Sequence, residues 1–337
     1  MDLTTSYLGL SLRNPLVASA SPLSNTVEGV RRLADAGVGA VVLYSLFEEQ
    51  LRQEAARAAA LTEAGTESFP EALSYFPASA RPEPAPRQYL DLLERAVAAV
   101  DIPVIASLNG VTAGGWTDHA AALEQAGAAA IELNIYYLPG DPLLPGREVE
   151  QRHLEILATV KAVTGVPVAV KLTPYFSSVG EMALRLDRAG ADGLVLFNRF
   201  IQPDIDPEKM DITACLELSS PAEARLPRTW IALLANQVSA SLAATTGVED
   251  ATDVAKYLLA GADVVMTASA LLRHGPAHAS VLLDGLSGWL ARQGADSVTD
   301  VRGLLAVPVG TGGAGDERSR YVTALQAADA GRETWPG

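Results

Sequence analysis

The stretch LDRAGADGLVLFN at 186–198 contains the pattern that decides the fold. Its first residues are typical of the last turn of a helix, and Gly190 is typical of the residue that ends such a helix. The apolar run that follows is typical of a short strand. The same phrase recurs as LADAGVGAVVLYS (33–45), LEQAGAAAIELNI (123–135) and LLAGADVVMTAS (258–269), with glycines at Gly37, Gly127 and Gly261. This repetition predicts alternating helices and parallel strands.

Four related phrases predict four more strands. They are NPLVASAS (14–21), DIPVIASLN (101–109), GVPVAVKLT (165–173) and VSASLAATTG (238–247). The resulting eight strands are mostly continuous apolar runs, which are typical of a parallel sheet covered on both faces. We therefore predict an α/β fold in which residues 1–337 form a single (β/α)8 TIM barrel.

Two segments are too long to be ordinary connections between a strand and a helix. The first is 47–86, which ends in ASARPEPAPR, and the second is 200–228, which contains PDIDPEKMDITACLEL. Each follows a strand, so in a barrel both project from the C-terminal face, where binding loops lie. We predict that both are lid-like insertions, with surface decoration or an oligomer contact as the alternative.

The composition limits the classes of partner. A formal net charge of −15 disfavours binding to nucleic acid or anionic membranes, so we expect a small-molecule substrate and a homodimer. The single cysteine, Cys215, excludes an intramolecular disulfide, and the four histidines show no zinc pattern, so no metal is expected. The N-terminus does not read as a signal peptide, which leads us to expect a cytoplasmic protein.

Polar residues gather near the C-terminal ends of the predicted strands. Because alternate side chains of a barrel strand face the lumen, residues of one parity converge on one cavity. Such groups are costly in an apolar layer unless a partner satisfies them. We therefore expect a binding site that includes Ser19, Ser21, Tyr44, Ser107, Asn109, Glu132, Asn134, Tyr136, Lys171, Thr173 and Asn198.

Lys171 is the most informative of these residues. It is the one lysine in the apolar strand VPVAVKLTP, where an unpaired ammonium is strongly disfavoured. A structural ion pair with Glu132 would explain it. It could also be a cation beside an electron-rich ring or a phosphate, or a nucleophile that forms a Schiff base. The lysine alone does not choose among these.

The turns after the last two strands are candidates for phosphate binding. Barrels commonly bind phosphate there, with backbone N–H groups and a helix N-terminus. Small residues that allow close backbone approach occupy both turns, namely Thr245, Thr246 and Gly247 in the first and Ala268 and Ser269 in the second. Neither GxGxxG nor GxxxxGK[ST] is present, so a Rossmann site and a P-loop are unsupported.

Several phrases together resemble the dihydroorotate dehydrogenase family, most closely its soluble single-domain class. They include GLSLRNPLVASAS, IELNI, VKLTPYF, ATTGVEDATDVAKYLLAGADVV and ASALLRHGP, and the likeness extends from about Leu8 to Leu305. The resemblance implies an FMN-dependent barrel that oxidises a CH–CH bond next to a carbonyl, converting dihydroorotate to orotate or acting on a related substrate. A Schiff-base lyase or aldolase using Lys171, and an inactive flavin-binding barrel, are the alternatives.

The resemblance also implies residue roles. Lys171 matches the family lysine that lies beside the flavin. Asn134 matches the family asparagine that contacts both flavin and substrate, and Asn198 matches an asparagine that binds the substrate. Tyr44 and Asn109 are further predicted substrate contacts. The remaining predicted FMN contacts are Ser19, Ala20 and Ser45 at the ring, and Thr246, Gly247, Ala268 and Ser269 at the phosphate.

Three positions depart from the family pattern. The Cys or Ser that acts as base just beyond the fourth strand is replaced by Tyr136 or Tyr137, which we predict to be catalytic together with Lys171. Tyr44 occupies the place of a second lysine, and the Met-Gly-Leu-Pro-Asn stretch is absent around 75–78. A tyrosine acts as a base only if its pKa, ordinarily near 10, is lowered or its proton passes to a neighbour. We therefore expect a substrate related to dihydroorotate as readily as dihydroorotate itself.

Overall fold

The computed structural model describes residues 1–50, 85–110, 116–137, 140–200, 203–213 and 217–310, with 318–319, 322–323 and 326. Eight parallel strands form its central sheet. They are β3 (Leu16–Ala18), β4 (Ala40–Val42), β6 (Val104–Asn109), β7 (Ala130–Asn134), β8 (Val168–Leu172), β9 (Gly193–Leu196), β12 (Ser241–Ala244) and β13 (Val264–Thr267). Strand β13 pairs with β3 and so closes the sheet into a barrel, while the two-residue strand β5 (Leu46–Phe47) extends along β6.

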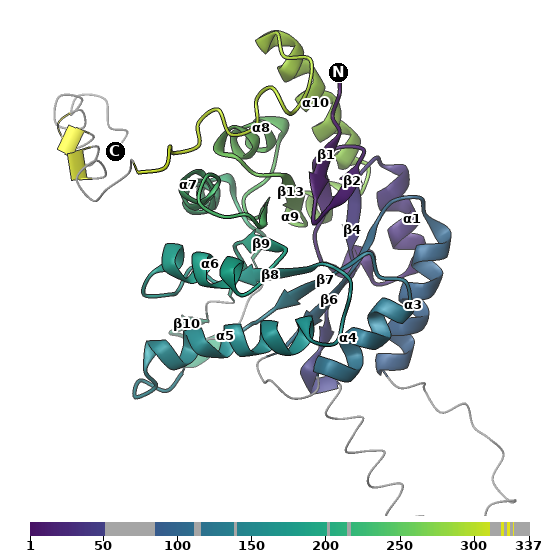
Figure 1. The fold of residues 1–337 in the computed structure, drawn as a ribbon, viewed down its shortest axis with the longest axis vertical. Coiled ribbons are helices and arrows are strands. Elements are labelled where there is room, and N and C mark those ends of the chain that lie inside the picture. Colours follow the sequence, from purple (N-terminus) through teal and green to yellow (C-terminus); the bar gives the residue numbers. More distant parts are fainter. Residues whose placement is uncertain are drawn as a thin grey trace, which may run out of the picture.

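Helices follow the strands and surround the barrel (Figure 1). Their bounds are α1 (Val27–Asp35), α3 (Ala85–Ala99), α4 (Trp116–Gln125), α5 (Gly146–Lys161), α6 (Val179–Arg188), α7 (Arg225–Leu234), α8 (Ala251–Ala260), α9 (Ser269–His274) and α10 (His278–Gln293). The four predicted glycines follow α1, α4, α6 and α8 with φ between 92° and 114°, a conformation that L-residues rarely adopt. The prediction of a (β/α)8 TIM barrel is confirmed.

The lumen of the barrel is filled by small and medium apolar side chains at its N-terminal end. These side chains form one buried cluster, which contains Val17, Ala40, Val42, Ile105, Ala130, Ala169, Val195, Ala243, Val264 and Met266. The cluster also contains Tyr7, Leu8 and Leu12 from the antiparallel hairpin of β1 (Thr5–Tyr7) and β2 (Leu10–Leu12). The hairpin therefore closes the lumen opposite the predicted site, and the cavity can open only at the strand C-termini.

The two predicted insertions differ in how much of them the structure describes. Most of the first, residues 51–84, lies outside the described residues, as does Cys215 in the second. The second contains the hairpin β10 (Asp204–Asp206) and β11 (Asp211–Thr213), then the 3-10 helix η3 (Pro221–Ala224). Residues 225–228 belong to helix α7, so this segment is shorter than 200–228. Among the described helices, none combines the length and apolarity needed to cross a bilayer.

Candidate functional site at the strand C-termini

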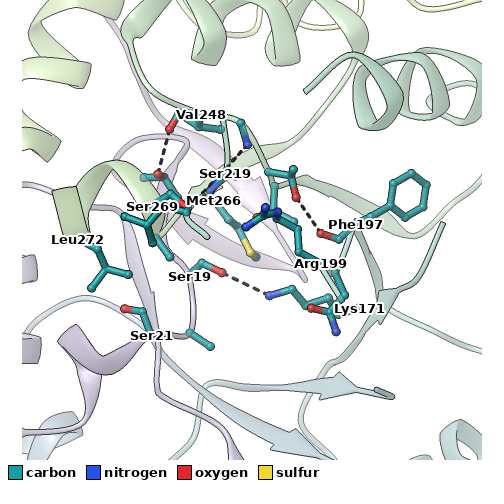
Figure 2. Close-up of a pocket in the computed structure, with 18 of the residues that line it drawn as sticks. Ser19, Ser21, Lys171, Phe197, Arg199, Ser219, Val248, Met266, Ser269 and Leu272 are labelled. Carbon is teal, nitrogen blue, oxygen red and sulfur yellow. Dashed lines mark hydrogen bonds between the residues drawn. The ribbon is translucent and has the colours of Figure 1, made fainter. Parts of the chain in front are cut away.

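A cavity of about 220 Å³ opens at the C-terminal end of the barrel. Three groups of predicted residues meet around it, as Figure 2 shows. Ser19, Ala20 and Ser21 come from the end of β3, Lys171 from β8, and the turns after β12 and β13 supply Thr245, Thr246, Gly247, Ala268 and Ser269. Segments far apart in the sequence thus converge on one cavity, as the parity of the strands predicts.

Lys171 points from β8 toward Ser19 at the wall of this cavity (Figure 2). Its Nζ lies 3.3 Å from Oε1 of Glu132 and 3.4 Å from Oγ of Ser19. The Lys171 and Glu132 side chains are only 8% and 1% exposed. The predicted ion pair is therefore present, and the carboxylate offsets the cost of burying the ammonium in the lumen. Because Lys171 also lines the cavity, the ion pair and a ligand contact are compatible.

Strand β4 departs from the predicted alternation. Ala40 and Val42 face the lumen, so strict alternation would place Tyr44 there as well. The strand ends at Val42, and it is Ser45 whose Oγ lies 2.9 Å from the lumen-facing Ser107. Tyr44 instead packs on Tyr89 of α3, with ring centroids 5.4 Å apart. Ser45 therefore lies at the lumen and Tyr44 lies against α3, and the substrate contact of Tyr44 stays a prediction.

The two asparagines predicted to bind substrate lie side by side. Nδ2 of Asn198 donates to Oδ1 of Asn134 at 2.5 Å. Asn134 is the last residue of β7 and Asn198 follows β9, so the pair spans the end of β8. Asn109 is the last residue of β6 and pairs in register with Asn134 of β7.

The turn after β12 has a backbone conformation that few residues adopt. Thr246 and Gly247 have φ of 82° and 70°, so two successive residues adopt left-handed backbone. A Cβ on Gly247 would lie 2.6 Å from the Ser220 carbonyl oxygen, which requires glycine there. The hydroxyl of Ser219 accepts from Gly247 N–H and bonds to Ser269 Oγ, joining the two predicted turns. No side chain caps α9, so its first N–H groups face the cavity region uncapped.

Arg199 and Ser219 are polar residues that line the cavity and that sequence reasoning missed. Arg199 lies between the Lys171 and Ser219 sides of the pocket (Figure 2), where it donates to Glu223 at 2.9 Å and to the Glu217 carbonyl. Ser219 lies in the second predicted insertion, 28 residues before its partner Gly247. Arg199 directly follows the predicted Asn198, so a wider reading of LFNR could have found it. No local pattern marks Ser219.

A larger cavity of about 700 Å³ adjoins the first below the β10–β11 hairpin. The two cavities share Phe197, Asn198, Arg199, Glu217 and Thr246. Aromatic and apolar side chains form much of its remaining wall, namely Pro174, Tyr175, Phe200, Leu226 and Pro227. The site therefore has more room beside Asn198 than the first cavity alone provides.

The two candidate tyrosines after β7 have different surroundings. Tyr136 packs on Phe200, a wall residue of the larger cavity, with ring centroids 4.2 Å apart. The Tyr137 ring lies under the guanidinium of Arg152 from α5, 4.2 Å from its centroid, and packs against the core between strands and helices. Tyr136 therefore lies beside the larger cavity, whereas Tyr137 lies on the helical side of the barrel.

The model of the dihydroorotate dehydrogenase family matches residues 77–290, which is more than half of the chain. This chain belongs to the dihydroorotate dehydrogenase family. The resemblance of the sequence motifs is thereby confirmed, and the matched region contains Asn134, Lys171, Asn198 and both phosphate-type turns. Members of the family are oxidoreductases, so this chain is assigned to that class of enzyme.

Named relatives cover almost the full length of the chain. The catalytic subunit of dihydroorotate dehydrogenase B (NAD(+)) from Methanothermobacter thermautotrophicus is 26% identical over 320 residues, 90% of this chain and 98% of that protein. The same subunit from Methanocella arvoryzae is 30% identical over 298 residues, 87% and 94% of the two chains. A putative dihydroorotate dehydrogenase A (fumarate) from Aeropyrum pernix is 27% identical over 311 residues, 90% and 97%. These names differ in the electron acceptor, so similarity does not select one.

Proposed function

We propose that this chain is an FMN-dependent oxidoreductase that removes two hydrogens from a CH–CH bond next to a carbonyl. The substrate would be dihydroorotate or a related saturated compound. The observation that carries the proposal is the shared cavity: a buried lysine on β8 lines the same 220 Å³ space as the left-handed turn at Thr246 and Gly247. A cation at one end and an anion-binding turn at the other suit a flavin ring with its phosphate.

The residues present fit FMN at its phosphate end. The Thr246 backbone and the uncapped start of α9 would offer N–H groups, whereas the Gly247 N–H is held by Ser219 Oγ and a side chain at Gly247 would not fit. Arg199 is a nearby cation that lines the same cavity. We infer that Thr246, Gly247, Ala268 and Ser269 would hold the phosphate, and that Ser219 would fix the two turns relative to each other.

The residues at the other end fit the flavin ring. Ser19 and Ala20 line the cavity, where the Lys171 ammonium contacts Ser19, and Ser45 lies beside Ser107 in the lumen. Bound FMN would supply the hydride-accepting centre of the reaction. Lys171 would stabilise negative charge that develops on the ring, because a buried ammonium interacts strongly in a site with little water.

Substrate binding is assigned to the asparagine pair. With Asn134 Oδ1 accepting from Asn198, the Nδ2 amino group of Asn134 remains to donate to a ligand and Oδ1 of Asn198 remains to accept from it. A substrate with neighbouring N–H and C=O groups, such as a cyclic imide, matches this pattern. The aromatic wall and the 700 Å³ cavity provide room for a larger relative of dihydroorotate.

Proton removal from the substrate is assigned to Tyr136. It stands where relatives in the resemblance carry Cys or Ser, and its ring packs against the wall of the larger cavity. Tyr137 contacts Arg152 on the helical side instead. The Schiff-base alternative has less support, because that chemistry needs a free amine and Lys171 is held in a buried ion pair with Glu132.

The test begins with the spectrum of the purified protein. We expect a yellow protein with a band at roughly 450 nm, as for flavins in general. Under anaerobic conditions, bleaching by dihydroorotate or by another saturated cyclic imide would identify the substrate. A protein that binds no FMN, or one in which borohydride traps a carbonyl compound on Lys171, would overturn the proposal. The homodimer and the cytoplasmic location remain predictions for sedimentation and fractionation to test.

A further inference from the structure

Two buried oxygen atoms in the barrel lumen have no hydrogen-bond partner among the described residues. They are the hydroxyl oxygen of Tyr7 and Oε2 of Glu132. Both residues are 1% exposed. An unsatisfied hydroxyl and an unsatisfied carboxylate oxygen in a low-dielectric interior are each costly, so two of them in one lumen require an explanation.

Tyr7 and Glu132 lie in adjacent layers of that lumen. Tyr7 belongs to the cluster that contains Ala130, and Glu132 is the next residue of β7 to face inward. Burial, and then the charge of Glu132, raise the pKa of the Tyr7 hydroxyl well above its usual value, so the hydroxyl keeps its proton and can only be a donor to a carboxylate. A donor and an acceptor thus lack partners within the same space.

Glu132 already contacts the cofactor side through its other oxygen. Oε1 lies 3.3 Å from Lys171 Nζ, which in turn lies 3.4 Å from Ser19 at the cavity wall. A line of polar groups therefore runs along the barrel axis from the N-terminal hairpin to the cavity. Its only gap lies between the Tyr7 hydroxyl and Oε2 of Glu132.

We propose that the Tyr7 hydroxyl donates to Oε2 of Glu132 through one buried water, and that Glu132 is thereby a positioning residue that directs the Lys171 ammonium at the cofactor site. The functional half of this inference rests on the proposed FMN site. A hydrogen bond to Oε2 stabilises the carboxylate, and the carboxylate stabilises the ammonium. The hairpin that closes the barrel then also tunes the residue at its open end.

The first experiment measures FMN dissociation constants of the full chain by fluorescence titration. Glu132→Gln keeps the side-chain shape but removes the charge that holds the Lys171 ammonium in place. We expect FMN to bind about 10-fold more weakly than to the wild type, the effect of losing one charged hydrogen bond. The other charged side chains around the cavity, Arg199 and Glu217, are unchanged in this comparison.

The second experiment tests the hairpin. Tyr7→Phe keeps the ring packing and removes only the hydroxyl, and we expect about 3-fold to 10-fold weaker FMN binding, the effect of one lost hydrogen bond. In a Lys171→Met background the same change should have no effect on FMN affinity, because Tyr7 acts through that ammonium. Leu12→Val, in the same hairpin, is the matched control and should leave FMN affinity unchanged in both backgrounds.

A cofactor-free readout separates failure of this inference from failure of the proposed function. In the protein without FMN, the ¹³Cζ resonance of Tyr7, assigned by its loss in Tyr7→Phe, should shift in Glu132→Gln. If the wild type binds no FMN, the flavin proposal fails while this measurement still tests the contact. An unmoved resonance, or equal effects of Tyr7→Phe with and without Lys171, would overturn the inference. If Glu132→Gln does not fold, the comparison of Tyr7→Phe in the wild-type and Lys171→Met backgrounds tests the inference by itself.

Discussion

Asn198 donates its side-chain N–H to the Asn134 side-chain oxygen at 2.5 Å, across the end of the strand that carries Lys171. Each amide fixes the orientation of the other, so the pair presents the amino group of Asn134 and the carbonyl oxygen of Asn198 in a set geometry. A site that is organised before the ligand arrives loses little freedom on binding. We therefore expect the asparagine pair to contribute to substrate selection.

Replacing Asn198 by Ala removes the acceptor offered to substrate and frees the Asn134 amide. We expect kcat/KM to fall at least about 10-fold, the effect of losing one or two hydrogen bonds to a buried ligand, while FMN content stays near that of the wild type. Steady-state kinetics with the substrate identified by flavin bleaching measure this. Asn236→Ala, whose side chain bonds only to the Val307 carbonyl among described residues, is the control. Equal kinetics for both variants would contradict the assignment.

Replacing Lys171 by Ala leaves the Glu132 carboxylate buried without a cation. Breaking a buried pair by removing one partner costs about 3–5 kcal/mol, so we expect a lower urea midpoint in addition to much weaker FMN binding. Adding Glu132→Gln should restore part of the stability and none of the FMN affinity. Lys161→Ala breaks the ion pair with Asp192, whose side chains are 31% and 35% exposed, and should change FMN affinity little.

A methyl group at Gly247 would collide with the backbone of the second insertion. Its Cβ would meet Ser220 O at 2.6 Å and Ala224 N at 2.8 Å, and φ of 70° adds strain. We expect Gly247→Ala to lose more than about 2 kcal/mol of stability and most FMN binding. Gly275 has φ of 85° with open space around it, so Gly275→Ala pays only the backbone cost and should retain FMN. Comparable flavin loading of the two variants would refute the phosphate assignment.

The two tyrosines after β7 can be separated by removing single hydroxyl groups. Tyr136→Phe should slow flavin reduction by about 100-fold, the scale of general acid–base assistance, without loss of flavin. Tyr137→Phe keeps the ring under Arg152 and should reduce flavin at the wild-type rate. Anaerobic stopped-flow reduction over a range of pH measures both. A slow Tyr137→Phe beside a normal Tyr136→Phe would reverse the assignment.

His153 makes the stability of the barrel depend on pH. Burial, aided by the charge of Arg152, lowers the pKa of its imidazole below 6.5, and its Nε2 has no partner among described residues. The neutral ring is favoured in the folded state, so its stability contribution is complete above the unfolded pKa and is lost as pH falls through the folded pKa. We expect unfolding free energy to fall by up to about 1.4 kcal/mol per pH unit below pH 6.5 from this group. His153→Gln should flatten that slope in urea titrations, and an unchanged slope would exclude His153 as its source.

The sequence predicts the barrel well because its signals are local. Each of Gly37, Gly127, Gly190 and Gly261 ends a helix and precedes an apolar strand within a few residues, and parallel order follows from the repetition. The convergence of Lys171 with the two phosphate-type turns is also predictable, because strand parity and barrel closure place C-terminal ends together. The positions of Tyr44, Ser219 and Tyr7 have no comparable local signal in the sequence.

Three features required the three-dimensional structure. Tyr44 packs on Tyr89 and does not follow the lumen-facing alternation of Ala40 and Val42, because β4 ends at Val42. The alternation of apolar residues in the sequence does not show where a strand ends. Ser219 reaches Gly247 through a loop whose path no residue pattern determines. Tyr7 enters the lumen only because the N-terminal hairpin folds under the barrel, and TSYLGLSL alone does not distinguish that position from a surface hairpin.

That hairpin has a consequence for how the protein matures. Tyr7, Leu8 and Leu12 are made well before Val264 and Met266, which belong to the cluster that buries them. On the ribosome these apolar side chains have no completed pocket to occupy until the eighth strand emerges. The hairpin therefore reaches its final place only after the last strand of the barrel has been made.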